Sequence, residues 1–299
     1  ANEIIVARTH RNAYDRALRS AGAVLVDAGT ADRETNAGIR GLEAWEVESV
    51  LSTKTAAIAE NFSGATRGDM PVLAEVARKH GLPLIVDAAA QLPPAENLKA
   101  PLAMGATLVV YSGGKAIGGP QSSGILAGRR DLIASAALQM LDMDVRHEAF
   151  YPPPVFFGNQ RPPAIPRHGI GRGFKASKEA IVGLLTALEE FLTRDERAVA
   201  GAARDRLEAM AGMLRGECRL KAEIVAGRSA AALPRLALHV EAPPAGPGAA
   251  QLAARLRRGS PRVFLAEGRI GENVLVLDLI AVMPEEDAAV VQTIKSALE

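Results

Sequence analysis

The sequence contains a single cysteine, Cys218, and this shortage excludes a fold built around intramolecular disulfides. A lone thiol is typical of proteins from a reducing compartment, so we expect a cytoplasmic protein. The chain has 299 residues, of which 48% are hydrophobic, enough to fill a substantial core in one large domain and a smaller one.

The sequence also lacks an excess of either charge. Lys and Arg number 35 against 34 Asp and Glu, and no long block of like charge occurs. This balance argues against a nucleic-acid partner, which usually requires a concentrated basic face. No apolar run approaches the roughly 20 residues that span a bilayer, and the first residues lack the features of a signal peptide. We expect a soluble, globular protein with neither a nucleic-acid nor a membrane partner.

The first 128 residues alternate short apolar runs with amphipathic stretches. Continuous apolar runs are typical of strands buried on both faces, and their alternation with helices predicts an α/β fold with a mostly parallel sheet and helices on both faces. The predicted strands are 4–6, 24–26, 56–59, 84–86, 107–111 and 124–127, and the predicted helices are 14–21 and 70–79.

Residues 151–173 are rich in Pro and Gly, which indicates an extended loop and a domain boundary. We therefore predict a large domain over 1–170 and a second region over 171–299. The second region is predicted to be a linking helix and a small α+β domain, with helices at 177–211 and 285–298 and strands at 236–240, 263–266 and 274–279.

Two charged residues follow predicted strands. Asp87 ends the run Leu84–Asp87, and Lys115 lies in the run Ser112–Lys115, Ser-Gly-Gly-Lys, after the next strand. In an open parallel sheet, ligands bind beyond the carboxyl ends of the strands, so both residues can meet one ligand.

This pair suits pyridoxal phosphate (PLP). An ionised Asp87 keeps the pyridine nitrogen protonated, Lys115 can form a Schiff base and move protons, and the Ser112 hydroxyl can reach a phosphate oxygen. The glycines beside Lys115 would let the backbone approach the cofactor closely. Singly, an Asp after a strand is more often a helix cap and a Lys after glycines a solvated loop residue; their order along the chain favours the cofactor.

The runs Ile85–Pro94 and Tyr111–Gly124 resemble the selenocysteine synthase (L-seryl-tRNA selenium transferase)-like family of fold-type-I PLP enzymes, and in particular its D-glucosaminate-6-phosphate ammonia-lyase branch. The similarity extends over nearly the whole chain. It implies a fold-type-I large domain, Lys115 as the Schiff-base residue, Asp87 as the partner of the ring nitrogen, and a homodimer or larger homo-oligomer.

The resemblance also suggests further cofactor contacts. His10 occupies the place of a residue stacked on the PLP ring, with an exposed turn histidine as the alternative. Asn61 follows a strand and would contact the PLP hydroxyl or the substrate, although a purely loop-forming role is the simpler interpretation.

Three basic residues resemble positions that bind substrate anions in selenocysteine synthase: Arg8, Arg172 and Lys175. Lys175 stands where that enzyme has Arg, and because a lysine has no bidentate fork, the preferred anion would differ. The alternative is a solvated basic turn before a helix.

Two departures from the family qualify the prediction. Fold-type-I enzymes bind the cofactor phosphate with a small-residue turn at a helix N-terminus, and none precedes Ile4, so we expect a large domain without that segment. The N-terminal tRNA-binding extension of selenocysteine synthase is also absent, which argues against a tRNA substrate.

The leading hypothesis is a PLP-dependent lyase that eliminates water or ammonia from a small hydroxylated amino acid, including sugar-derived or phosphorylated ones. The same Lys and Asp would serve a racemase, an aldolase or an aminotransferase, and a non-catalytic regulatory or assembly subunit is a third alternative. A nucleotide-binding role for Gly113-Gly114-Lys115 is disfavoured, because the spacing of a P-loop is absent.

Overall fold

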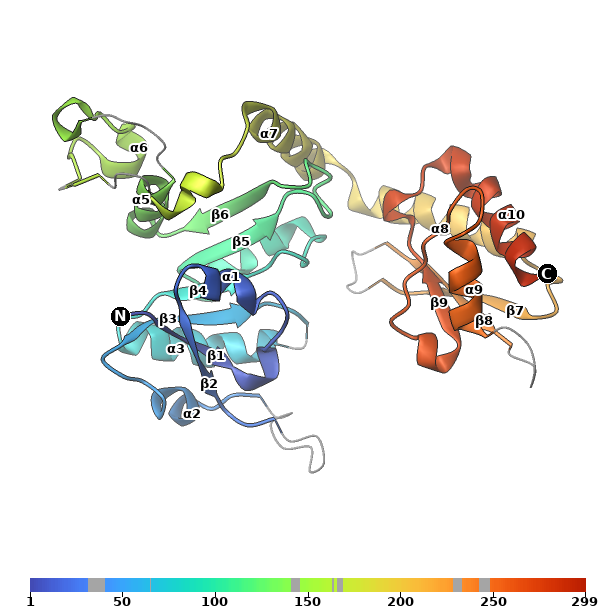
Figure 1. The fold of residues 1–299 in the computed structure, drawn as a ribbon, viewed down its shortest axis with the longest axis horizontal. Helices are drawn as coiled ribbons and strands as arrows, with labels where there is room; N and C mark the ends of the chain where they lie inside the picture. The colour runs from blue at the N-terminus through green and yellow to red at the C-terminus, as the bar shows by residue number, and fades with distance from the viewer. Residues whose placement is uncertain are drawn as a thin grey trace. The chain divides into compact units, whose positions relative to one another are not determined.

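The chain forms two compact units, Ala1–Leu192 and Thr193–Glu299 (Figure 1). In this computed structural model the described residues are 1–31, 41–64, 66–140, 146–162, 164–165, 169–227, 233–241 and 248–299. Within these ranges, no helix combines the length and the apolar character that a membrane crossing requires.

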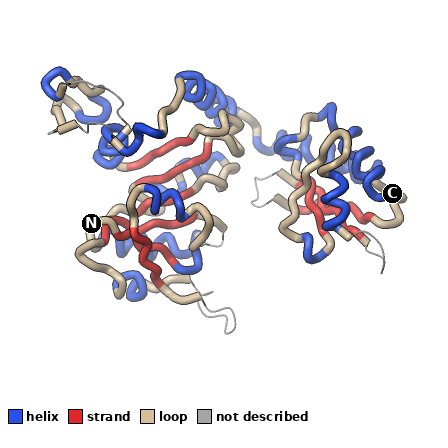
Figure 2. The backbone as a smooth tube through the Cα atoms, viewed as in Figure 1, coloured by secondary structure: helices blue, strands red, loops and turns tan. Residues whose placement is uncertain are grey.

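The first unit is built on a six-stranded sheet in the order β2-β1-β3-β4-β5-β6 (Figure 2). Its strands are β1 Glu3–Ala7, β2 Val24–Ala28, β3 Thr55–Asn61, β4 Leu84–Asp87, β5 Leu108–Ser112 and β6 Gly124–Gly128. All neighbours pair in parallel except β5 and β6, which are antiparallel. The mostly parallel α/β sheet predicted from the sequence is confirmed.

Helices connect these strands. The described helical segments of this unit are η1 Arg8–His10, α1 Asp15–Ser20, α2 Ala44–Glu48, η2 Arg67–Asp69, α3 Met70–Lys79, η3 Ala95–Leu98, α4 Ala100–Ala103, α5 Arg130–Gln139, η4 His147–Ala149, α6 Pro154–Phe157, η5 Ile170–Gly173 and α7 Lys178–Thr193. Helix α3 has the bounds that the sequence predicts. The extended loop expected over 151–173 contains two short helical turns, α6 and η5, because proline is accepted in the first turn of a helix.

The two faces of the sheet differ in how they are covered. Ile5, Ile58 and Val86 point into the core beneath α3 and are fully buried. Their immediate neighbours point the opposite way, since successive side chains in a strand alternate between faces. On that second face Val110 remains 38% exposed, so the sheet is open there next to α1.

The long helix predicted over 177–211 is wrong: two helices, α7 and α8 (Glu196–Met213), replace it. Asp195 begins the second helix, and its Oδ1 accepts the N–H groups of Arg197 and Ala198 at 2.9 and 3.1 Å, a typical N-cap. Helix α7 packs on the first unit through Leu184 and Phe191, so the division between the units falls after Leu192, whereas the sequence placed the boundary at residue 170.

The second unit is a small α+β structure. Its antiparallel sheet has the order β7-β8-β9, and α8, α9 and α10 supply much of the core on one face. The remaining bounds are β7 Leu220–Val225, β8 Arg235–Val240, α9 Ala249–Leu256, η6 Ile270–Glu272, β9 Val274–Leu277, η7 Leu279–Ala281, η8 Pro284–Glu286 and α10 Asp287–Leu298. The strand predicted over 263–266 is wrong, because only Ala266 pairs, in an isolated bridge to Val276.

Candidate active site

Two adjacent strands, β3 and β4, bring polar side chains to one edge of the sheet. Asn61 at the end of β3 lies beside Asp87 at the end of β4, and Asp87 lies beside Val110 of β5. Side chains two residues apart in a strand point to the same face of the sheet. Asn61, Asp87 and Val110 therefore share the open face with Ala59, Ile85 and Ser112, respectively. The Asp87 Oδ1 accepts the backbone N–H of Ala89 at 2.9 Å, which fixes the carboxylate at the strand end.

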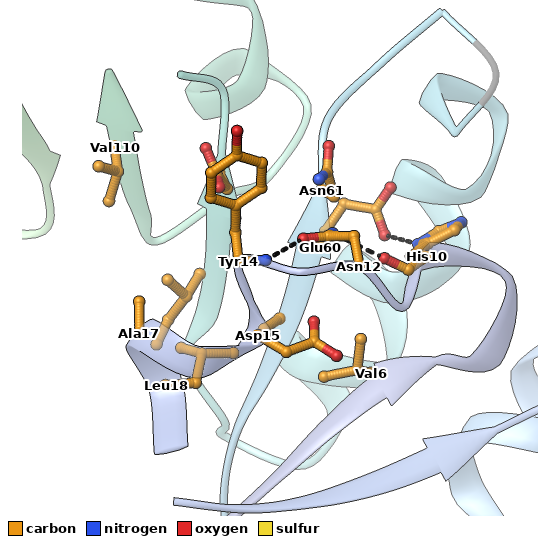
Figure 3. Close-up of a pocket in the computed structure, with 13 residues that line it drawn as sticks. Val6, His10, Asn12, Tyr14, Asp15, Ala17, Leu18, Glu60, Asn61 and Val110 are labelled. Atoms are coloured by element: carbon orange, nitrogen blue, oxygen red, sulfur yellow. Dashed lines mark hydrogen bonds and ion pairs between the residues drawn. The ribbon is translucent and has the colours of Figure 1, made fainter. Parts of the chain in front are cut away.

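A pocket of about 160 Å³ lies on this face. Its floor is apolar and is formed by Val6, Ala59, Ile85 and Val110. Asn61 and Asp87 supply polar groups, and the start of α1 forms the opposite wall, with the ring of Tyr14 standing upright at the pocket (Figure 3). A carboxylate beside an apolar floor is suited to a flat heteroaromatic ring with one basic nitrogen.

Lys115 lies in the turn that follows β5, next to Tyr14, and is not itself among the described residues that line the pocket. Its Nζ lies 5.8 Å from the centre of the Tyr14 ring, within the range of a cation–π contact. The turn is closed by backbone hydrogen bonds: Gly118 donates to the Lys115 carbonyl at 2.9 Å, and Gly119 donates to the Gly113 carbonyl at 2.8 Å. Tyr14 therefore shares the pocket with Asp87 and also contacts the Lys115 amine.

The glycines of this turn serve its own packing, which corrects the expectation that they make room for the cofactor. A Cβ on Gly113 would lie 2.2 Å from Ser123 Oγ and 2.7 Å from Leu184 Cδ1, and a Cβ on Gly114 would lie 2.8 Å from Gln121 Cα. The space beside both glycines is thus filled by protein. Leu184 belongs to α7, so this helix supports the Lys115 turn.

His10 lies in a buried cluster of charged groups. Its Nδ1 is 2.6 Å from Glu60 Oε2 and its Nε2 is 2.9 Å from Asp69 Oδ2, and its side chain is 2% exposed. We call Glu60, His10 and Asp69 the histidine clamp. His10 and Glu60 also line the pocket, and the clamp joins the end of β1 to β3 and to the segment before α3.

The clamp shifts the acid–base behaviour of its members. Burial lowers the pKa of His10, but the hydrogen bonds and negative charges of Glu60 and Asp69 outweigh burial, so the pKa is raised above its ordinary value of 6.5. Burial raises the pKa of Glu60 by more than the contact with His10 lowers it. The folded protein therefore favours a protonated imidazole between the two carboxyl groups.

The three basic residues proposed for substrate anions lie elsewhere in the first unit. Arg8 is in η1, and its Nη1 is 2.7 Å from Asp27 Oδ2. Arg172 is in η5, and Lys175 lies in the exposed segment between η5 and α7. Among the described residues that line the Asp87 pocket, none of these three occurs. The resemblance to selenocysteine synthase predicted that these three residues bind substrate anions, and the structure does not bring them to this pocket.

The residues around the pocket fit PLP. Asp87 offers a carboxylate for the ring nitrogen, Asn61 an amide next to it on the sheet, and Lys115 an amine 5.8 Å from the centre of the Tyr14 ring. Ser112 shares the face of Val110 and immediately precedes the Lys115 turn, where its hydroxyl can donate to a phosphate oxygen. In the described part of the chain, no cluster of three His, Cys, Asp or Glu side chains is arranged to hold a metal ion.

Sequence reasoning missed Tyr14, the two acids of the histidine clamp, and Leu184. The sequence pattern placed Tyr14 at the start of a predicted helix and gave it no role at the site, although Tyr14 lies four residues after His10 in the connection between β1 and α1. Glu60 carries a visible signal, because a charged residue inside an apolar strand requires a buried partner. Leu184 carries no signal, since its role depends on where α7 packs.

Comparison with known proteins supports the same assignment. No family model matches the chain. The D-glucosaminate-6-phosphate ammonia lyase of Salmonella typhimurium is 28% identical over 100% of this chain and 71% of its own length. A 5'-C-glycyluridine monooxygenase-decarboxylase of a Streptomyces species is also 28% identical, over 99% of this chain and 67% of its own length. The L-seryl-tRNA(Sec) selenium transferase of Desulfovibrio desulfuricans is 40% identical, but over only 21% of this chain and 15% of its own.

Solved structures agree with these relatives. A D-glucosaminate-6-phosphate ammonia-lyase superposes with a TM-score of 0.75 at 27% identity, covering 99% of this chain and 71% of that one. A sphingosine-1-phosphate lyase of Burkholderia pseudomallei, with a TM-score of 0.50 and 15% identity over 99% of this chain and 63% of that one, shares the fold. The chain thus has the fold of fold-type-I PLP enzymes and is homologous over its whole length to D-glucosaminate-6-phosphate ammonia-lyase.

Proposed function

We propose that the chain is a PLP-dependent lyase that releases ammonia from a small hydroxylated amino acid, including sugar-derived or phosphorylated ones. The observation that carries this proposal is that Tyr14 lines a pocket together with Asp87 at the carboxyl end of a parallel sheet and also contacts the Lys115 amine. The full-length similarity to an ammonia lyase supports the type of reaction.

When bound, PLP supplies an electron sink for the negative charge that develops at the substrate Cα. The Asp87 carboxylate would hold a proton on the ring nitrogen, and the Lys115 Nζ would take the proton from Cα. Lys115 would then pass a proton to the departing β-hydroxyl, which leaves as water. The resulting enamine takes up one water, so the net products are ammonia and a 2-oxo acid.

We propose Asn61 and Ser112 as further cofactor contacts, and His10 as a residue that positions the wall of the cofactor pocket through its contacts with Glu60 and Asp69. Asn61 lines the pocket beside Asp87, and the position of Ser112 before the Lys115 turn supports a phosphate contact. His10 also lines the pocket.

Arg8, Arg172 and Lys175 are proposed to hold the carboxylate or phosphate of the substrate. Arg8 would have to exchange Asp27 for the substrate, because its guanidinium is paired with that carboxylate. Arg172 and Lys175 would have to approach through a movement of η5 and the exposed segment that follows it.

The test of the cofactor assignment is covalent trapping. The protein is incubated with PLP, reduced with borohydride, digested and mapped by mass spectrometry, with Lys79→Ala as a matched control because Lys79 is an exposed lysine paired with Glu48. We expect the PLP adduct on Lys115, its loss in Lys115→Ala, and its retention in Lys79→Ala. A Lys115→Ala protein that keeps the visible absorbance band and turnover would refute the assignment.

A second reaction has a specific observation in its favour. The relative named as a monooxygenase-decarboxylase is as similar to this chain as the ammonia lyase, so the reaction has to be separated by its products. With D-glucosaminate-6-phosphate as the probe, the lyase predicts ammonia and a 2-oxo acid at equal rates with and without oxygen. Oxygen uptake with release of carbon dioxide from a glycyl-nucleoside would favour the second reaction, and inverted substrate without ammonia would indicate a racemase.

We further propose that the protein is cytoplasmic and works as a homodimer or larger homo-oligomer. Resemblance to fold-type-I enzymes supports the oligomer, and the single cysteine is typical of a reducing compartment. Sedimentation of the purified chain would test the assembly, and a monomer at micromolar concentration would contradict it.

A further inference from the structure

Tyr14 is placed where a flat ligand between Asp87 and Lys115 would need a partner for its ring. It lines the pocket with Asp87 (Figure 3). The residue is 69% exposed, and the centre of its ring lies 5.8 Å from the Lys115 Nζ. Among the residues that line this pocket, it is the one Phe, Tyr or Trp. An aromatic ring with an open face is the usual partner of a heteroaromatic ring.

His10 is unsuited to that contact in this structure. Only 2% of its side chain is exposed, so neither face of the imidazole is open to another ring. Both ring nitrogens are also held by carboxylates, at 2.6 Å from Glu60 and 2.9 Å from Asp69. Releasing the ring would leave two buried acids without their cation, at a large cost.

The connection between His10 and Tyr14 fixes the tyrosine instead. The Asn12 Nδ2 donates to the His10 carbonyl at 2.9 Å, and the Asn12 Oδ1 accepts the N–H of Tyr14 at 2.8 Å. The histidine clamp anchors the start of this turn, and the turn ends with Tyr14 at the N-terminus of α1. These contacts therefore hold the ring of Tyr14 in place before any ligand binds.

We propose that Tyr14, in place of His10, packs against the ring of the PLP held between Asp87 and Lys115, and that the histidine clamp and Asn12 hold Tyr14 in that position. This inference rests on the proposed function, because it requires PLP at Lys115. It assigns to the β1–α1 connection the aromatic contact that resemblance alone assigned to His10.

The test compares PLP binding by three variants of the whole chain. Tyr14→Leu removes the aromatic ring, and Tyr14→Phe keeps it without the hydroxyl. Tyr151→Leu is the matched control, because Tyr151 is 76% exposed and contacts Arg161 at 4.3 Å, away from the residues that line the pocket. Binding is followed by the visible absorbance and the induced circular dichroism of PLP, and by borohydride trapping at Lys115.

We expect Tyr14→Leu to bind PLP roughly tenfold more weakly and to lose most of the induced circular dichroism, with Tyr14→Phe and Tyr151→Leu within about twofold of the unmodified chain. If PLP is trapped on Lys115 in every variant with equal affinity and equal circular dichroism, the role of Tyr14 is refuted while the cofactor assignment stands. If the unmodified chain traps no PLP at Lys115, the proposed function and this inference both fail.

Discussion

At the scale of single residues, the position of Asp87 explains why one carboxylate can serve the cofactor. It ends a buried strand, and the hydrogen bond from the Ala89 N–H holds one of its oxygens at the sheet edge. The charge of this group matters more than its shape, because a neutral amide of equal size could keep the Ala89 contact.

We therefore predict that Asp87→Asn folds normally but loses activity. Without the negative charge, a proton on the ring nitrogen is no longer stabilised, so kcat should fall by about 10²-fold or more. Asp131→Asn is the control, because Asp131 is exposed and pairs only at the surface with Arg129. Steady-state ammonia release measures both variants, and an Asp87→Asn enzyme with full kcat would contradict the role of the charge.

The histidine clamp yields a stability prediction. His10→Ala would leave Glu60 and Asp69 buried without their shared cation, and we expect a loss of about 3 kcal/mol in the free energy of unfolding of the first unit. His80→Ala is the matched control, because His80 pairs with Glu48 near the surface at 3.1 Å and should change stability by less than about 1 kcal/mol. Urea denaturation compares the two, and equal effects would mean that the clamp contributes little.

The clamp also predicts a pH dependence. The pKa of His10 is raised in the folded protein, so the folded state binds its proton more tightly than the unfolded chain does. Its stabilising contribution is then fully present below pH 6.5 and is lost as the pH rises through the raised pKa. Glu60, whose pKa is also raised, changes stability in the same direction. Stability measured from pH 6 to 9 should fall in the unmodified chain more than in His10→Ala; parallel curves would contradict this.

At the scale of elements, the turn from Ser112 to Ser123 shows how α7 takes part in the site. Gly113 has no room for a Cβ between Ser123 and Leu184, so its hydrogen is required for the turn to pack on α7. Lys115 follows two residues later in the same turn. Helix α7 therefore helps to hold the turn that carries Lys115.

Gly113→Ala should therefore destabilise the first unit by about 1–3 kcal/mol and weaken PLP binding, because the added methyl group forces the turn away from α7. Gly68→Ala is the control in the same unit, since a Cβ there meets nothing within 4 Å and the backbone needs no positive φ. Thermal unfolding and PLP titration measure both changes. A Gly113→Ala protein with unchanged stability would show that the turn adapts at no cost.

At the scale of the whole molecule, the second unit has its own core. Leu207, Leu236 and Ile294 are fully buried in one cluster contributed by α8, β8 and α10. Arg206 of α8 adds a bidentate pair with Asp287 of α10, with contacts of 2.9 and 2.6 Å. These interactions lie entirely within residues 193–299.

We predict that residues 193–299, produced alone, fold cooperatively. The expected result is a sigmoidal urea transition with native-like helical circular dichroism, because the core needs no residue from the first unit. Arg206→Ala in this fragment should lower its free energy of unfolding by about 1–2 kcal/mol through loss of the bidentate pair. A fragment without a cooperative transition would mean that the two units stabilise each other.

Much of the first unit was predictable from the sequence, because its pattern is local. Strands buried on both faces are continuous apolar runs, and α3 shows clear amphipathic spacing, so these elements appeared near their observed bounds. The second unit was harder. The run over 263–266 is apolar but forms only one bridge, and the break at Asp195 depends on a cap in an otherwise helical stretch.

The sequence by itself determined the parallel sheet and the places of Asp87 and Lys115, because the end of a strand is a local feature and parallel strands end at one edge. Only the tertiary structure decided which side chains surround them. The carboxylates that meet His10 come from segments 50 and 59 residues further along the chain. Such contacts depend on packing between distant segments, which no local pattern encodes.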